Sequence, residues 1–223
     1  MKYKAIIFDM DGTIINSEHR WNEATVHLLK TKANLTEEQA YQLIPQFKGA
    51  SSYTSCSFIK MAYRPKESIE ELMKEKDAFV FKNFAKLVTF IDGFEAFHNQ
   101  LSSLGLPSAI ATNAHQSSLD RIKKHIPINT FFKEHIYCID QVQKKAKPLP
   151  DVYLFAAKKL NIDPEYCIAI EDTSHGIAAA QAAGMFCIGI NTGNDKEALR
   201  FADLIIDHYN EIDIKSLLIR KKQ

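Results

Sequence analysis

The sequence lacks long apolar runs and any strong excess of charge, and each absence excludes a class of protein. No apolar stretch approaches the roughly 18 residues that a membrane-spanning helix needs. The 28 basic and 27 acidic side chains leave a formal net charge of +1, which offers no electrostatic footprint for nucleic acid. These absences favour a globular protein that binds neither membranes nor nucleic acid.

Cysteine is also scarce, and its spacing excludes the usual paired-cysteine sites. The four cysteines, Cys56, Cys138, Cys167 and Cys187, form no CxxC pair, and three of them lie in or beside apolar runs. Buried, reduced thiols of a cytoplasmic protein are the expected state. The first residues pass straight into an apolar strand, so no signal peptide is predicted. We expect a cytoplasmic protein and, since nothing indicates association, a monomer.

Six short apolar segments, bounded by polar residues or glycine, have the features of strands covered on both faces. They are Tyr3–Phe8, Ser108–Ala111, His135–Ile139, Cys167–Ile170, Phe186–Ile190 and Leu204–Ile206. Helical segments lie between them, including Phe94–Leu104, Pro150–Leu160 and Ile177–Ala183. Strands that alternate with helices over residues 92–218 predict an α/β fold with a doubly wound parallel sheet.

Residues 16–90 do not share this alternation and read as helical throughout. The expected helices are Glu18–Leu29, Thr36–Gln46, Tyr53–Met61 and Ser68–Lys86, and capping boxes begin at Thr36 and Ser68. A helical block therefore follows the first strand as an insertion. We expect two domains: a small helical cap of residues 16–91, and an α/β core made of residues 1–15 and 92–223.

Two carboxylates follow the first strand, in the sequence Asp9-Met10-Asp11-Gly12-Thr13. Residues i and i+2 of an extended segment point the same way, so Asp9 and Asp11 can face one site while Met10 faces elsewhere. Gly12 permits a sharp turn after them. Because buried charge is costly unless it is paired, these carboxylates need a positive partner.

Polar side chains also follow three later strands: Thr112 and Asn113, then Lys147, then Glu171 and Asp172. Ligands of a doubly wound sheet bind outside the carboxyl ends of its strands, so we expect these groups to meet. Without the helical block, roughly one βαβ unit separates the first two sites, which places them on neighbouring strands. The carboxylates suit Mg²⁺, which shares its remaining ligands with water and phosphate.

This set of groups predicts phosphoryl transfer. One carboxylate could attack phosphorus and form an acyl phosphate, and a second could protonate the leaving oxygen and then deprotonate water. The lysine and the hydroxyl would contact the remaining phosphate oxygens. Other readings stay open: helix caps or surface charges, the metal-binding DxD of a nucleotide-sugar glycosyltransferase, or a non-catalytic binding scaffold. The glycosyltransferase reading leaves Lys147 and Asp172 unexplained.

The segments "DMDGT", "KPLPD" and "EDTSHGIAAAQAAGM", with a threonine after the second core strand, resemble the haloacid dehalogenase-like superfamily. The chain is most similar to the helical-cap branch that holds β-phosphoglucomutases and sugar-phosphate phosphatases. The resemblance implies Asp9 as nucleophile and Mg²⁺ ligand, and Asp11 as general acid/base whose backbone carbonyl also binds the metal. One departure is Ala146, where the family usually has glycine.

The resemblance also implies roles for the later sites. Thr112 and Asn113 would bind the transferring phosphoryl group, and Lys147 would neutralise the aspartyl-phosphate intermediate. Asp172 would be an Mg²⁺ ligand, with Glu171 bound through water or supporting the ligands. Gly12 and the cap residue Lys48 complete the set expected to bind phosphate or substrate.

The second aspartate excludes dehalogenation, because a halide leaves without a proton whereas the alkoxide of a phosphate ester needs one. Mutases of this branch use a cap histidine near the position of Trp21, and an arginine where "FKGASS" has Ser52. Without that arginine a second phosphate loses its bidentate partner. We therefore expect a phosphatase for a small phosphorylated metabolite, a sugar phosphate being favoured, with a sugar-phosphate mutase as the alternative. Trp21 is expected in the core rather than as a ligand contact, and His115 or His175 could line the rim of the site.

Overall fold

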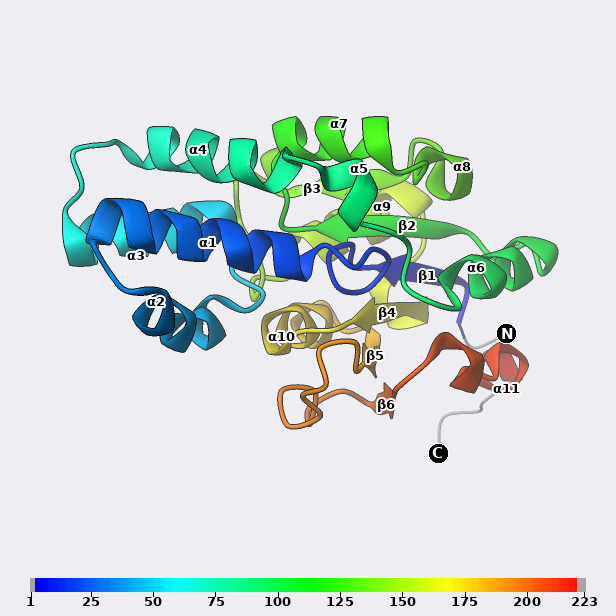
Figure 1. Cartoon of the computed structure of the whole chain (residues 1–223). Coiled ribbons are helices and arrows are strands. Elements are labelled where there is room, and N and C mark those ends of the chain that lie inside the picture. Colours follow the sequence, from blue (N-terminus) through cyan, green and yellow to red (C-terminus); the bar gives the residue numbers. More distant parts are fainter. Residues whose placement is uncertain (1–2, 220–223) are drawn as a thin grey trace.

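The computed structural model describes residues 3–219 of the chain. Six parallel strands form one sheet in the order β3-β2-β1-β4-β5-β6, with helices on both faces (Figure 1). The strands are β1 Ala5–Phe8, β2 Ser108–Thr112, β3 Ile136–Cys138, β4 Cys167–Glu171, β5 Phe186–Ile190 and β6 Leu204–Ile206. All six predicted strands are present, so the predicted α/β fold is confirmed, and β1 and β2 are neighbours as the spacing indicated.

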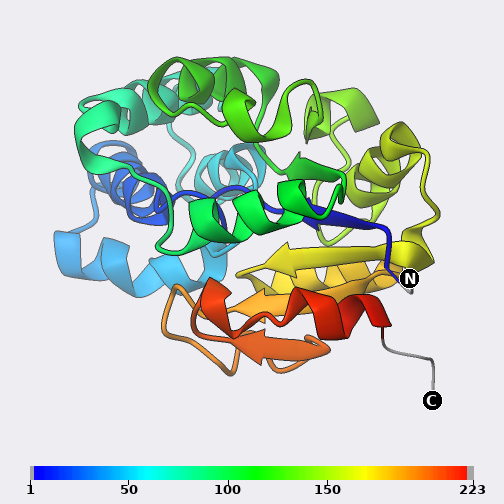
Figure 2. The ribbon, with the colours of Figure 1, turned by 90° about the vertical axis from the view of Figure 1, so that its right-hand side faces the viewer.

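Alternating side chains of β1 supply two separate cores, one on each face of the sheet. Ile6 and Phe8 join a large aromatic cluster, whereas Ala5 and Ile7 pack on the opposite face. The first face is covered by α6 Phe94–Ser103, α7 Gln116–His125, α8 Asn129–Phe132 and α11 Ile214–Ile219, and the second by α9 Asp151–Leu160 and α10 Ser174–Ala182. Figure 2 shows β1 (blue) running through the middle of the molecule.

Between β1 and α6 the chain forms a group of helices beyond the carboxyl ends of the strands (Figure 1). They are α1 Glu18–Ala33, α2 Glu37–Leu43, α3 Ser52–Tyr63, α4 Ile69–Phe81 and α5 Phe84–Leu87. Their own hydrophobic cluster includes Val26, Leu29, Phe47 and Leu72. Phe84, in contrast, joins the large cluster of the sheet. The division into a cap of residues 16–91 and a core of residues 1–15 and 92–223 stays a prediction.

Short 3₁₀ turns complete the chain: η1 Ile44–Phe47, η2 Ile139–Val142, η3 Pro164–Tyr166 and η4 Tyr209–Glu211. The predicted helix over 36–46 becomes α2 followed by η1, because Pro45 cannot donate a backbone hydrogen bond. Both predicted capping boxes, at Thr36 and Ser68, are present.

The predicted continuous helix over 68–86 is wrong, because the chain breaks between α4 and α5. Asn83 adopts the left-handed conformation with φ 63°, which asparagine tolerates better than most residues. The buried guanidinium of Arg20 donates to two carbonyls at the end of α4, so this helix end is capped by a side chain of α1. The sequence carries no local signal for a partner so distant.

Within residues 3–219 no helix is both long and apolar enough to cross a membrane. All four cysteines are buried and free, as predicted.

His98 makes the fold sensitive to acid. It lies in the aromatic cluster, with Nε2 2.9 Å from the hydroxyl of Ser108, and burial lowers its pKa from the ordinary 6.5 to about 4. Between pH 6.5 and 4 the unfolded chain takes up a proton here that the folded chain does not, so stability falls as pH falls.

We expect His98→Gln to remove this part of the acid sensitivity. Between pH 7 and pH 5 the wild-type protein should lose about 2 kcal/mol more unfolding free energy than the variant does. Urea titrations of both proteins at the two pH values measure the difference. An equal loss in both proteins would show that His98 is not the group responsible.

Candidate active site

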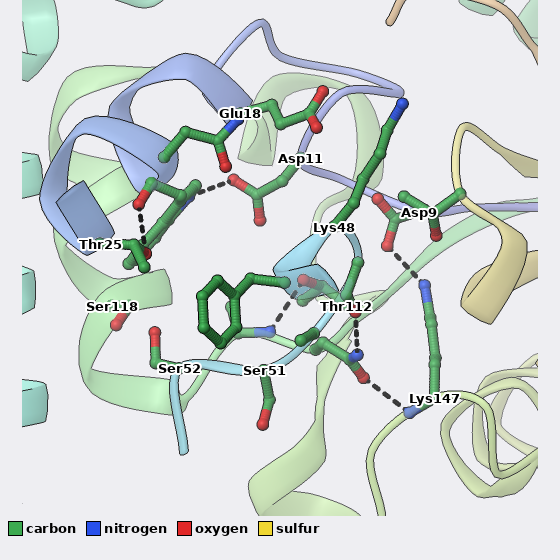
Figure 3. Close-up of a pocket in the computed structure, with 18 of the residues that line it drawn as sticks. Asp9, Asp11, Glu18, Thr25, Lys48, Ser51, Ser52, Thr112, Ser118 and Lys147 are labelled. Carbon is green, nitrogen blue, oxygen red and sulfur yellow. Dashed lines mark hydrogen bonds and ion pairs between the residues drawn. The ribbon is translucent and has the colours of Figure 1, made fainter. Parts of the chain in front are cut away.

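Asp9 and Asp11 enter one pocket at the carboxyl end of β1, and Met10 between them is buried in the large core cluster. This is the alternation expected of extended residues i and i+2. The same pocket is lined by the predicted site residues Lys48, Thr112, Asn113, Lys147 and Asp172. Glu171 and Gly12 do not line the pocket but contact residues that do: Glu171 bonds to Lys147, and Gly12 lies against Asp172. The carboxyl ends of the strands and the helical segment (helices α1 to α5) therefore bring together side chains up to 163 positions apart in sequence. Figure 3 shows part of this set, including Asp9, Lys48 and Lys147.

Lys147 lines the pocket and forms ion pairs with two of the carboxylates. Its Nζ donates to Asp9 Oδ1 at 2.5 Å and to Glu171 Oε1 at 2.6 Å, and its side chain is 3% exposed. The hydroxyl of Tyr153, from α9, donates to the same Glu171 oxygen at 2.7 Å. Glu171 thus holds Lys147 against Asp9. Figure 3 shows the contact between Lys147 and Asp9.

Asp172 has one oxygen bound and one unsatisfied. Its Oδ1 accepts from the hydroxyl of Thr13 at 3.0 Å, while the buried Oδ2 has no hydrogen-bond partner among residues 3–219. Asp9, Glu171 and Asp172 each present an oxygen, and these oxygens lie within 4.8 Å of one another. Three carboxylates and one ammonium leave two negative charges if all ionise. An orphaned buried oxygen in such a set fits a divalent cation with hard oxygen ligands.

The pKa values of the cluster point to the same charge imbalance. Burial raises the pKa of Asp9 to about 8, although Lys147 opposes this shift. Burial, together with the charges of Asp9 and Glu171, raises the pKa of Asp172 well above its usual range. Burial opposes protonation of Lys147, but the two carboxylates outweigh it and raise the pKa of this ammonium. With lysine as the one cation, the cluster retains protons that an added cation would displace.

Two glycines permit the carboxylates to sit this close to the backbone. Gly12 has φ +84°, and a Cβ there would lie 2.2 Å from Asp172 Oδ2. A Cβ on Gly176 would lie 1.9 Å from the carboxyl carbon of Glu171. The Gly12 N–H donates to the carbonyl of Ile15 at 2.7 Å, so its predicted contact with phosphate would require that bond to open.

Thr112 and Asn113 follow β2 at the pocket wall. The Thr112 hydroxyl accepts from the backbone N–H of Ala114 at 3.0 Å and retains its own proton to donate. The Asn113 side chain accepts from the Lys147 N–H at 2.9 Å and donates to the Gly49 carbonyl at 3.2 Å. It therefore links the lysine loop to the segment that carries Lys48. The predicted contacts of both residues with a phosphoryl group stay predictions.

Asp11 is held from the side of α1. The hydroxyl of Ser17 and the indole Nε1 of Trp21 both donate to its Oδ1, the latter at 2.9 Å (Figure 3). Trp21 packs against the large core cluster, as expected, but it also lines the pocket. Trp21 therefore contributes both to the core and to the pocket wall. Burial raises the pKa of Asp11, and the two donors oppose this shift.

Two lysines reach the pocket from the helical segment. Lys48 was predicted, and its Nζ lies 3.9 Å from Asp195 Oδ2. Lys76 was missed: it is 4% exposed, donates to the Ser55 hydroxyl at 2.8 Å, and has no carboxylate within 4.0 Å among the described residues. Its one sequence signal is its place on the buried stripe between Leu72 and Val80 of α4.

A sequence model of the haloacid dehalogenase-like hydrolase family matches residues 6–190. The chain belongs to this family. It is 28% identical to validoxylamine A 7′-phosphate phosphatase of Streptomyces hygroscopicus subsp. limoneus, over 94% of this chain and 96% of that protein. Hexitol phosphatase A of Escherichia coli K12 is 26% identical, with 96% and 95% covered.

Among solved structures, β-phosphoglucomutase from Clostridium difficile aligns with a TM-score of 0.80 and 25% identity, covering 97% of this chain and 96% of that one. Family and relatives together identify the chain as a hydrolase of phosphate monoesters, as its motifs predicted.

The close approach at Gly176 yields a test of the cluster. In Gly176→Ala the new methyl group must displace the Glu171 carboxylate, which then releases Lys147. We expect the kcat for phosphate-ester hydrolysis to fall about tenfold or more, because a positioned charge is lost next to Asp9. Steady-state phosphate release measures it. Ala178→Ser, at an exposed position of the same helix, is the control. Wild-type kcat in Gly176→Ala would contradict this account.

Proposed function

We propose that this protein is a Mg²⁺-dependent phosphatase that hydrolyses a small phosphorylated sugar or polyol through a covalent phosphoryl intermediate on Asp9. The observation that carries the proposal is the cluster of Asp9, Lys147, Glu171 and Asp172, with its orphaned carboxylate oxygen and unbalanced negative charge. A phosphatase nucleophile must be ionised, and this cluster needs one further cation for that.

The residues present fit a magnesium ion. Asp9, Asp172 and the backbone carbonyl of Asp11 would hold it, and Glu171 would act through water because Lys147 and Tyr153 already occupy its Oε1. When bound, Mg²⁺ supplies positive charge that keeps the carboxylates ionised and neutralises phosphate oxygens. Lys147 contributes a fixed charge on the other side of Asp9.

The chain's own groups then account for both half-reactions. A carboxylate oxygen of Asp9 attacks phosphorus, the bond from phosphorus to the leaving oxygen breaks, and Asp11 gives that oxygen its proton. Asp11 next takes a proton from a water molecule, which attacks the acyl phosphate and releases phosphate and free Asp9. Thr112 and Lys147 would donate to the phosphoryl oxygens in both steps.

The pocket favours one phosphate group over two. Among the described residues, no arginine lines the pocket. Ser52 lies in the pocket wall, at the sequence position where mutases of this branch have an arginine. Two relatives are named hexitol phosphatase A and fructose-1-phosphate phosphatase, which supports a sugar or polyol phosphate as substrate. The likeness to β-phosphoglucomutase keeps a mutase as second candidate. Conversion of a hexose 1-phosphate to its 6-phosphate without phosphate release would favour that candidate.

We expect Asp9→Asn to lower turnover about a thousandfold or more while the protein stays folded, because the amide cannot form the acyl phosphate. Phosphate release from a panel of sugar and polyol phosphates measures turnover, and circular dichroism checks the fold. Asp120→Asn, at an exposed position of α7, is the matched control. Activity retained in Asp9→Asn would exclude the covalent route.

Removal of divalent cations should silence the enzyme, since two negative charges of the cluster would lose their partner. We expect EDTA to abolish phosphate release and Mg²⁺ to restore it. Mg²⁺ should also raise the Tm of the wild-type protein more than that of Asp172→Asn, because it binds the folded state at this residue. Full activity in EDTA, or equal Tm shifts, would contradict a metal site at Asp172.

A further inference from the structure

His115 is a polar residue of the pocket wall that the proposed chemistry does not use. It lies in the loop between β2 and α7, three residues after Thr112, and it lines the same pocket as Asp9. Its side chain is 12% exposed. It belongs to the sheet side of the pocket and faces α4, where it interacts with the charge of Asp77.

One edge of the His115 ring is fixed. Nδ1 lies 2.9 Å from Asp140 Oδ1, and the other oxygen of Asp140 accepts the Gln116 N–H, the first of α7, at 2.7 Å. Partial burial opposes ionisation of Asp140, but hydrogen bonds from Gln116 and His115 outweigh it and lower its pKa. An ionised carboxylate only accepts, so Nδ1 carries a proton, and this selects the imidazole tautomer in which Nε2 is an acceptor.

The other edge of the ring has no partner. Nε2 of His115 is buried and makes no hydrogen bond to any residue of the described chain. A buried acceptor left unpaired is costly, so a fixed ring in this state indicates that its partner arrives from outside. His115 lines the pocket and Asp140 does not, so the ring lies between its carboxylate partner and the site, with Nε2 as its one unpaired nitrogen.

The surrounding wall shows what kind of partner fits. Figure 3 shows a group of hydroxyl side chains on the opposite side of the pocket from Asp9 and Lys147: Thr25, Ser51, Ser52 and Ser118. Thr25 donates to the Trp21 carbonyl and Ser118 to Asp77, and Ser51 pairs with Thr54. These oxygens keep lone pairs, so they can accept from the hydroxyls of a ligand. An acceptor at Nε2 likewise requires a donor, which a hydroxyl offers and a second phosphate dianion does not.

We propose that His115, oriented by Asp140, accepts a hydrogen bond from a hydroxyl group on the alcohol part of the substrate and so selects polyhydroxylated phosphate monoesters over alkyl ones. This inference rests on the proposed phosphatase function and assigns its specificity. His115 contacts the leaving group, whereas Asp140 is a positioning residue that fixes the tautomer.

The test compares two substrates that share the phosphate and differ in the hydroxyls. The fastest member of a panel of hexitol, hexose and pentose phosphates is set against n-hexyl phosphate, with Mg²⁺, for the full chain. The ratio of their kcat/KM values is the readout. His115→Phe, which keeps a ring without nitrogens, and His115→Ala should each lower this ratio about tenfold or more, the effect expected for one lost hydrogen bond.

Controls separate recognition from folding. His115→Gln, whose amide can reach the Nε2 position, should recover part of the ratio, and His19→Ala, an exposed imidazole outside the pocket, should leave it unchanged. Asp140→Asn keeps an acceptor for Gln116 but donates to Nδ1, which moves the ring proton to Nε2. We expect it to lower the ratio with little change in Tm.

An equal loss for both substrates, or a wild-type ratio in His115→Phe, would overturn the inference and leave the phosphatase intact. So would a wild-type enzyme that hydrolyses n-hexyl phosphate as well as any polyhydroxy phosphate. Failure of the proposed function is distinct: the wild-type protein would then release phosphate from neither substrate, and the inference would fall with it.

Discussion

The buried charge at the end of the two central strands is the constraint around which the rest of this structure is arranged. Asp9 follows β1, Glu171 ends β4 and Asp172 follows it, so parallel pairing alone forces three carboxylates together. One ammonium, Lys147, lies among them. Asp172 Oδ2 is buried and has no hydrogen-bond partner among residues 3–219. Folding therefore concentrates more negative charge than Lys147 offsets, and the proposed Mg²⁺ would balance it.

Small residues around this cluster make room for its charged side chains and for the helices that position them. Gly12 and Gly176 leave room for carboxylates where any side chain would collide. On the sheet face below α9 and α10, Ala5, Ala109 and Ala169 keep the helices close to the strands, and α9 places Tyr153 against Glu171. The choice of residue at these glycines and alanines is thus restricted by charged groups that other strands and helices carry.

Much of this arrangement could be predicted from the sequence, because its signals are local. Short apolar runs bounded by polar residues or glycine located all six strands. The polar residues that follow them lie together at the carboxyl ends of the strands, because parallel strands share a direction. The capping boxes at Thr36 and Ser68 were equally readable. The break at Asn83 was not, because its cap comes from Arg20, and no local pattern encodes a contact across more than 60 residues. Lys76 was missed for the same reason: its surroundings are set by helix packing.

Trp21 is the chain's only tryptophan, and its indole lies in the pocket with a hydrogen bond to Asp11. Its ring also packs edge-on against Phe81 of α4, with the Lys76 ammonium 5.9 Å from the ring centroid. The tryptophan fluorescence of this enzyme therefore comes from one indole that is hydrogen-bonded to Asp11, lies near a buried cation and packs on α4. A ligand that enters the pocket should change its emission without any label, so binding to an inactive variant can be followed by fluorescence.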